Sequence, residues 1–254
     1  MQRRVLLVVL AALVLSTHSF AQEDFESLVE EAKQAYEGGN LEEAEELYRE
    51  AISLDDENAA LYYNLGNLYY DMERFGEAIA AYENSIDRGA DDRRVYYNLG
   101  NAYYEHANFD AALEAYREAR SVGEGESRDG ELTVNTAKTL RQLERDGEAR
   151  SLLEEHLEEN SGDALAWFHL GNIAYDAENY EEAADHYSRA AENRDGFTRA
   201  QFNLGNTLYR LGSYREAAEA FTAVVAREPE NRDALYNLGL SYLSLAEALG
   251  EEEE

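Results

Sequence analysis

Asparagine and aromatic side chains that recur at a fixed spacing are the groups in this sequence best placed to do chemistry. The string Asn-Leu-Gly-Asn occupies residues 64–67 and 98–101, and Asn-Leu-Gly returns at 203–205 and 237–239. An asparagine side chain carries both a hydrogen-bond donor and an acceptor. A row of asparagines could therefore match the NH and CO groups of an extended backbone, while aromatic rings add apolar contact at low entropic cost. The predicted chemistry is reversible binding of a protein or peptide.

Catalytic and metal chemistry have little support in the residue types. The 254-residue chain contains no cysteine, which excludes a thiolate nucleophile and cysteine-based zinc sites. Its histidines beyond residue 21 form no HExxH motif, and the acidic runs lack the spacing of an EF-hand. His169 stands where other segments have asparagine, which predicts a polar binding residue rather than a catalyst. We therefore expect a protein that is not an enzyme, with no cofactor and no metal.

The net charge narrows the choice of partner. With 54 Asp and Glu against 22 Lys and Arg, the formal charge is −32, so the surface would repel phosphate backbones and anionic headgroups. Nucleic acid is an unsuitable partner. An acidic, lysine-poor surface also suits a high-salt habitat, in which ions screen the self-repulsion.

Residues 1–21 have the layout of a cleaved secretory signal. Two arginines precede an apolar run from Val5 to Leu15, and the segment ends in Ser19-Phe20-Ala21. The alternative, an uncleaved anchor, is disfavoured because the run is about half of the ~20 residues that span a bilayer. We expect an exported protein in the periplasm, the cell envelope or the medium, with no membrane attachment after cleavage.

The elements that position the asparagines follow from a period of 34 residues. Glycines at 66, 100, 171, 205 and 239 are separated by 34, 71, 34 and 34 residues, so a degenerate segment fills the longer gap. The repeats predicted from this spacing are 25–58, 59–92, 93–126, 130–163, 164–197 and 198–231, followed by a half repeat at 232–249 and an acidic tail at 250–254. Within 59–92, apolar spacing predicts helices from about Ala60 to Met72 and from about Phe75 to Asp87. Residues 127–129 are an insertion in a glycine-rich loop, which predicts a flexible joint.

The repeat resembles the tetratricopeptide family, through Tyr62-x2-Leu65-Gly66-x2-Tyr69 and Ala78-x3-Tyr82. This resemblance implies an all-α fold, a right-handed solenoid of antiparallel helix pairs with a C-terminal capping helix. It also implies that the small residue of each first helix meets an alanine on the second. In such proteins one flank of the first helices lines a concave groove that binds peptides or partner helices. The string at 58–67 is similar to repeats of the aerotolerance (Bat) operon proteins.

The flank that would line this groove is rich in aromatic and amide side chains. The predicted groove residues are Tyr63, Asn64, Asn67, Tyr70, Tyr97, Asn98, Asn101, Tyr104, Lys138, Arg141, Phe168, His169, Asn172, Phe202, Asn203, Asn206 and Tyr209. Helix stacking and solubility would also account for many of these residue types.

Basic residues on the same flank allow two interpretations. A basic strip that accepts an acidic partner could be formed by Lys33, Lys138, Arg141, Arg94, Arg199 and Arg210. Alternatively, the basic side chains of this flank pair with nearby carboxylates such as Glu105, Glu131 or Asp176. A separate alternative for the whole protein is a structural assembly that joins through its ends, although residues 232–249 are expected to cover the last apolar face.

Overall fold

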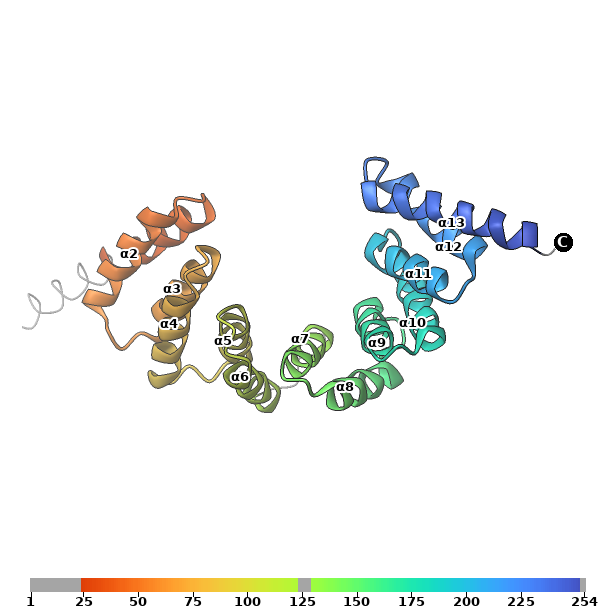
Figure 1. Cartoon of the computed structure of the whole chain (residues 1–254). Helices are drawn as coiled ribbons and strands as arrows, with labels where there is room; N and C mark the ends of the chain where they lie inside the picture. Colours follow the sequence, from red (N-terminus) through yellow and green to blue (C-terminus); the bar gives the residue numbers. More distant parts are fainter. Residues whose placement is uncertain (1–23, 123–128, 252–254) are drawn as a thin grey trace, which may run out of the picture. The chain divides into compact units, whose positions relative to one another are not determined.

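All secondary structure in the described part of the chain is helical. A computed structural model describes residues 24–122 and 129–251, and these ranges contain helices and turns but no strand (Figure 1). The predicted signal 1–21, residues 127 and 128 of the predicted insertion 127–129 and tail residues 252–254 lie outside the described residues, whereas Asp129 is helical. The described residues form two compact bodies, here called the N-terminal body (24–122) and the C-terminal body (129–251).

The N-terminal body consists of three helix pairs, one in each range predicted as a repeat. Its helices span residues 24–37, α2 Leu41–Leu54, α3 Ala59–Asp71, α4 Phe75–Asp87, α5 Arg93–Glu105 and α6 Phe109–Ser121. Successive helices are antiparallel and each first helix packs on its second (Figure 1). The predicted all-α fold of paired helices is therefore confirmed, and the helix predicted at 75–87 has those bounds.

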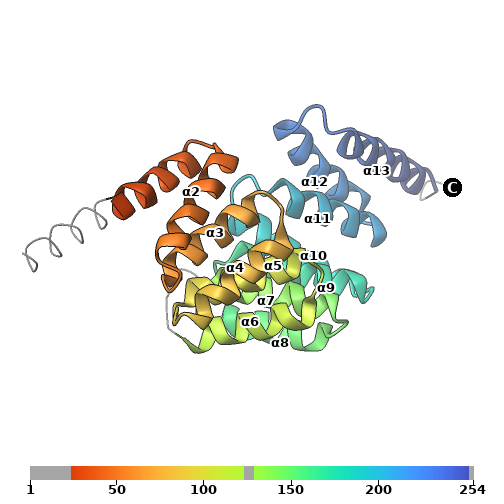
Figure 2. The same ribbon diagram turned by 90° about the vertical axis from the view of Figure 1, so that its left-hand side faces the viewer.

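The C-terminal body repeats this plan and adds one helix. Its helices are α7 Asp129–Gln142, α8 Asp146–Glu159, α9 Ala164–Asp176, α10 Tyr180–Asn193, α11 Thr198–Arg210, α12 Tyr214–Arg227 and α13 Arg232–Glu251 (Figure 2). Helix α13 continues two residues past the predicted end at 249, so part of the predicted tail is helical.

Short polar side chains start several of the first helices. Asn58 Oδ1 accepts a hydrogen bond from the backbone NH of Ala60, and Asp92 accepts one from the NH of Arg94. Asp163 accepts from two backbone NH groups at the start of α9. Each cap satisfies NH groups that have no partner inside the helix.

The turn between the two helices of each repeat uses a left-handed residue. The fifteenth residue of every full repeat has a positive φ, and these residues are Gly39, Glu73, Ala107, Glu144, Glu178 and Gly212. Four of the six carry a side chain in a conformation that favours glycine. The sequence gives only a weak sign of this position, because glycine occupies it only at Gly39 and Gly212.

The atoms nearest to the recurrent glycine of the first helix belong to an aromatic ring, a neighbour that was not expected beside the alanine. A Cβ built on Gly66 would lie 2.5 Å from Cε1 of Tyr82, and one on Gly100 would lie 2.5 Å from Cε1 of Tyr116. The alanines of the second helices are buried as well, including Ala78 and Ala112. Each ring follows the alanine of its helix by one helical turn, as Tyr82 follows Ala78, so both residues lie on the same face of the second helix.

Within the described residues no second helix of the same repeat packs on α13, and several of its apolar side chains are exposed. It packs against α12 through the buried Ala234 and Ser241. Nothing lies within 4 Å of a Cβ built on Gly239, although this glycine has the register of Gly66. The exposed large apolar side chains of α13 are Leu235, Tyr236, Tyr242, Leu243 and Leu249. The predicted cap covers α12 but presents an apolar face of its own.

Candidate functional site

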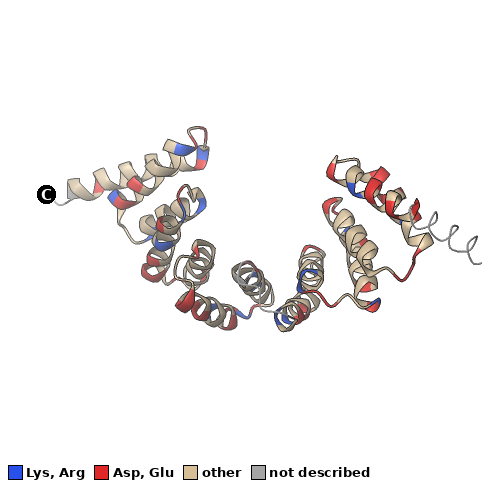
Figure 3. Ribbon diagram, turned by 180° about the vertical axis from the view of Figure 1, so that it is seen from behind, with Lys and Arg blue, Asp and Glu red and all other residues tan. Residues whose placement is uncertain are grey.

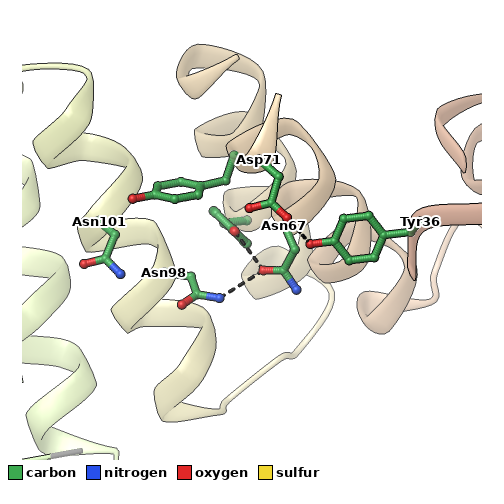
Figure 4. Close-up of a pocket in the computed structure, with 7 residues that line it drawn as sticks. Tyr36, Asn67, Asp71, Asn98 and Asn101 are labelled. Carbon is green, nitrogen blue, oxygen red and sulfur yellow. Dashed lines mark hydrogen bonds between the residues drawn. The ribbon is translucent and has the colours of Figure 1, made fainter. Parts of the chain in front are cut away.

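Each body contains a pocket that has a counterpart in the other body, and the two pockets are built from equivalent residues. The first pocket has a volume of about 260 Å³ and is lined by Tyr36, Asn67, Tyr70, Asp71, Tyr82, Asn98 and Asn101 (Figure 4). The second pocket has a volume of about 250 Å³ and is lined by Arg141, Asn172, Tyr175, Asp176, Tyr187, Asn203 and Asn206. Every residue of the first pocket corresponds to the residue 105 positions later in the second, as 67 does to 172. The chain therefore carries the same site twice.

Helical spacing brings the lining residues of the first pocket together. On α3, Asn67, Tyr70 and Asp71 are three and four residues apart, which places them on one face. Asn98 and Asn101 lie three residues apart on the next first helix, α5. The side chain of Tyr82 reaches this face from α4, because Gly66 leaves room for its ring.

The asparagines of the first pocket are held by hydrogen bonds inside the protein. The hydroxyl of Tyr82 donates to Oδ1 of Asn67 over 2.8 Å, and Nδ2 of Asn98 donates to the same oxygen over 2.9 Å (Figure 4). Both lone pairs of that oxygen are thus used. The described residues give no hydrogen-bond partner to Nδ2 of Asn67 or to Oδ1 of Asn98. One donor and one acceptor therefore remain for a ligand.

The second pocket has the same arrangement. The hydroxyl of Tyr187 donates to Oδ1 of Asn172 over 2.8 Å, and Nδ2 of Asn203 lies 3.4 Å from that oxygen. A further pair follows, in which Asn237 donates to Oδ1 of Asn206 over 2.9 Å. The pattern links an asparagine of one first helix to an asparagine of the next.

Burial keeps the tyrosines at the base of the pockets protonated. The pKa of Tyr82 and that of Tyr187 are raised well above the ordinary tyrosine range, chiefly because their hydroxyls are removed from water. Each hydroxyl can therefore donate to its asparagine at any pH at which the protein is folded. This donation fixes the direction in which the amide points.

The two pockets differ most at the residue contributed by the preceding first helix. In the first pocket the hydroxyl of Tyr36 donates to Oδ2 of Asp71 (Figure 4). In the second pocket Arg141 forms an ion pair with Asp176 and a longer one, 3.4 Å, with Asp146. Of the two interpretations of the basic residues, pairing with a carboxylate is the one found at Arg141.

His169 lies beside the second pocket in an environment that keeps it neutral. Burial lowers its pKa from 6.5 to about 4, and the nearby positive charges of Lys138, Arg141 and Arg199 act in the same direction. The buried Nδ1 of His169 has no hydrogen-bond partner among the described residues. A cationic role for this histidine near neutral pH is thus disfavoured.

Eight of the predicted groove residues line the two pockets. They are Asn67, Tyr70, Asn98, Asn101, Arg141, Asn172, Asn203 and Asn206. Asn64, Lys138 and His169 lie on the same helices outside the pocket linings. The list of predicted groove residues omitted the carboxylates and base tyrosines of the pockets, and it also omitted Tyr36 and Tyr175. A signal for most of them exists in the sequence, because the carboxylates, the base tyrosines and Tyr175 each have an identical residue 105 positions away, whereas Tyr36 corresponds to Arg141.

Most of the predicted aromatic residues pack on other rings. The ring centroids of Tyr63 and Tyr82 are 6.0 Å apart, and those of Phe202 and Phe221 are 5.6 Å apart. Tyr97, Tyr104 and Tyr209 make similar contacts with Tyr116, Phe109 and Tyr214. Each of these rings is therefore packed against another ring of the protein.

Phe168 was predicted to face the groove, and this prediction is wrong. Its side chain is 8% exposed and belongs to the core of the C-terminal body. The ring of Phe197 lies 5.1 Å away and the guanidinium of Arg199 lies 5.6 Å from the Phe168 ring. Phe197 covers it, whereas the equivalent residue of the N-terminal body is the charged Asp92.

Residues 24–122 and 129–251 contain neither a cluster of metal-ligating side chains nor a helix able to cross a membrane. No group of three or more potential metal-ligating side chains gathers there. None of the helices in these ranges has both the length and the apolar character needed to cross a membrane.

Comparison with known proteins places the fold. A family model described as "Tetratricopeptide repeat" matches residues 63–129, 134–196 and 202–253, and one described as "TPR repeat" matches residues 32–73. No curated protein matches the sequence.

Several solved structures are similar. YrrB, a TPR protein described as having an unusual peptide-binding site, shares 24% identity over 74% of this chain and 96% of its own, with a TM-score of 0.55. PilF of Pseudomonas aeruginosa shares 17% sequence identity over 90% of this chain and 99% of its own, with a TM-score of 0.63. PilW, described as a type IV pilus biogenesis factor, shares 13% sequence identity over 85% of this chain and 97% of its own, with a TM-score of 0.69.

At these identities the similarity to solved structures concerns the fold alone. The likeness of residues 58–67 to the aerotolerance-operon proteins depends on that string, and none of these three structures is described as such a protein. Proteins of this repeat type generally mediate contacts with protein or peptide partners, and the fold is typically not enzymatic. Because the family models cover most of its length, the chain belongs to the tetratricopeptide repeat family.

Proposed function

We propose that this protein is an exported, non-enzymatic adaptor that binds an extended segment of a protein partner along the face containing the two pockets. The observation that carries this proposal is the pairing of asparagines. In each pocket one amide oxygen is occupied by a tyrosine hydroxyl and a neighbouring amide, which leaves Nδ2 of one asparagine and Oδ1 of the other.

A donor and an acceptor fixed side by side match the CO and NH groups of a peptide backbone. Because the buried tyrosines set the direction of the amides, a ligand would not have to order them. Such contacts do not depend on the side chains of the ligand, so the remaining lining residues would supply the selectivity.

The proposal is tested by changing only the free donor. Asn67→Asp with Asn172→Asp keeps the oxygen that accepts from the tyrosine and replaces the exposed NH2 by an acceptor. Peptides selected from a random library on the wild-type protein should bind this double variant at least about tenfold more weakly. The carbonyl of the ligand loses its hydrogen-bond donor and faces a carboxylate oxygen instead. Isothermal titration measures the affinities.

A matched control carries the same chemical change away from the pockets. Asn193 is exposed at the end of α10, so Asn193→Asp adds one carboxylate outside both pockets. We expect it to bind the selected peptides as the wild type does. Equal affinity of the double variant and the control would reject the proposed role of the asparagines.

The proposal of export is supported by residues 1–21, which combine two arginines, an apolar run and a small-residue end. Expression of the full chain in a bacterial host should yield an envelope fraction whose N-terminal residue is Gln22. Recovery of chain that begins at Met1 in the cytoplasm alone would reject this part.

A second candidate function is self-association through α13. Its apolar side chains at Leu235, Tyr242 and Leu249 are spaced by seven residues, which places them on one helix face, and the Tyr242 side chain is 56% exposed. Gly239 leaves the same kind of space that receives a ring in the full repeats. An exposed apolar helix face of this kind suits a second copy of the chain.

This candidate predicts a concentration-dependent dimer that Tyr242→Glu dissociates. Leu54→Glu is the control, because Leu54 is equally exposed, at 63%, but lies on α2. Sedimentation velocity between micromolar and hundred-micromolar concentrations measures both. A monomer at every concentration would remove this candidate.

A further inference from the structure

The first pocket and the second pocket share their asparagines but differ in charge. Position 36 is tyrosine and the equivalent position 141 is arginine, whereas Asp71 and Asp176 are the same residue. Asp176 is paired with Arg141. Asp71 receives only the hydroxyl of Tyr36 and has no ion pair among the described residues. The first pocket therefore holds a carboxylate whose charge is not neutralised.

A second difference lies one helical turn beyond the asparagines. Glu105 follows Asn101 by four residues on α5, and Arg210 follows Asn206 by four residues on α11. Glu105 is close enough to raise the pKa of Tyr70, as Asp71 also does. Counting these residues beside the linings, the first pocket has two carboxylates at or near it, while the second has one carboxylate and two guanidinium groups.

The other basic residues near the pockets do not reverse this difference. Lys33 and Lys138 occupy equivalent positions, 105 residues apart, and both lie outside the pocket linings. Arg94 is held by Asp92 over 2.6 Å, whereas the equivalent Arg199 lies against the rings of Phe168 and Phe197. Of these two equivalent arginines, Arg94 in the N-terminal body is the one whose charge is neutralised by a carboxylate. Figure 3 shows the acidic residues, in red, spread over the helices and turns of both bodies.

We infer that the first pocket binds a lysine or arginine side chain of the partner and that the second pocket does not. This inference depends on the proposed peptide binding and adds the charge of the side chain that the first pocket accepts. Asp71 and Glu105 supply the opposite charge, and the rings of Tyr36 and Tyr70 supply aromatic surface for the cation and its methylene chain.

The size of the first pocket agrees with a single side chain. Its volume, about 260 Å³, is below the ~300–1,000 Å³ of pockets that hold small-molecule ligands. The asparagine donor and acceptor at its wall would hold the backbone of the same residue. A lysine in an extended segment would thus make both kinds of contact.

Three blocked tripeptides test the inference. The probes are acetyl-Gly-Lys-Gly-amide, the same peptide with norleucine, which has no charge, and the same peptide with glutamate. Side-chain amide signals of Asn98 and Asn203 in ¹⁵N NMR spectra of the whole protein report the first and second pockets separately. We expect the lysine peptide to bind at Asn98 at least about fivefold more tightly than the norleucine peptide, and to show no such preference at Asn203.

Matched substitutions assign the effect to the named residues. Asp71→Asn keeps the acceptor for Tyr36 and should abolish the preference for lysine at Asn98, and Glu105→Gln should reduce it. Asp176→Asn, the equivalent change in the second pocket, should leave the preference at Asn98 as it is. Arg141→Tyr should create a preference for lysine at Asn203. Circular dichroism of each variant checks that the helices are retained.

The outcomes separate this inference from the proposed function. Equal binding of all three peptides at both pockets would keep peptide binding and overturn the preference for a cation. A response at Asn98 to the lysine peptide alone would support the cation site and remove general backbone recognition. No response to any peptide at either pocket would overturn both.

Discussion

At the scale of single residues, a glycine in the middle of a helix needs a packing reason, and the rings of the second helices provide it. A Cβ on Gly100 would lie 2.5 Å from the buried ring of Tyr116, while one on Gly239 would meet nothing within 4 Å. The glycine is not obligatory, because Ala32 and Ala137 stand at this position in the first and fourth repeats. In the fourth repeat Leu153 replaces the ring.

This contrast predicts opposite effects of one substitution at two places. Gly239→Ala should stabilise the protein by up to ~1 kcal/mol, because alanine favours the helix and no atom is displaced. Gly100→Ala gains the same propensity but overpacks the Tyr116 ring, so it should be about 2 kcal/mol less favourable than Gly239→Ala. Urea unfolding followed by circular dichroism measures both. Equal changes in the free energy of unfolding would contradict the packing described for the glycine.

The neutral His169 predicts a loss of stability in mild acid. Its pKa is lowered from 6.5 to about 4 in the folded protein, so between these values the unfolded chain binds a proton that the folded chain does not. The stability from neutral His169 is therefore complete above pH 6.5 and declines as the pH falls towards 4. Between pH 7.5 and 5 the wild type should lose about 2 kcal/mol more than His169→Asn. The same loss in both proteins would mean that His169 titrates normally.

At the scale of elements, the turn inside each repeat depends on one residue in the left-handed conformation. Gly212 has a φ of +77° and no atom within 4 Å of a built Cβ, so only its conformation constrains it. Gly212→Ala should destabilise the protein by about 1 kcal/mol, and Ala107→Gly, at the equivalent turn, should be neutral or stabilising. Thermal unfolding of the two variants provides the comparison. A stabilising Gly212→Ala would show that the turn adopts another conformation.

The helices could be predicted from the sequence, whereas the pockets could be predicted only in part. The 34-residue period and the apolar spacing around Leu65 and Ile79 were sufficient to place helices to within a residue. The asparagines of the pockets were found because they share a flank with Tyr70. Their internal hydrogen bonds were missed, because the donor at Tyr82 comes from the other helix of the pair. Phe168 was misplaced because covering by Phe197 is a tertiary contact that no local spacing reports.

At the scale of the whole molecule, the net charge of −32 is the dominant property of the surface. Repulsion among like charges opposes the compact state, and added salt screens it. The melting temperature should therefore rise by several degrees between low salt and ~1 M NaCl at pH 7.5. The rise should largely disappear near pH 4.4, the pI of the sequence. A melting temperature that does not respond to salt at pH 7.5 would reject the importance of this repulsion.

The central claim is that a partner segment binds at the paired asparagines of the first helices. A crystal structure of the protein with a peptide selected from a random library tests it most directly. The account predicts a peptide whose backbone CO accepts from Nδ2 of Asn67 or Asn172 and whose NH donates to Oδ1 of Asn98 or Asn203. A peptide bound only to the outer surfaces of second helices such as α4 and α10 would contradict it.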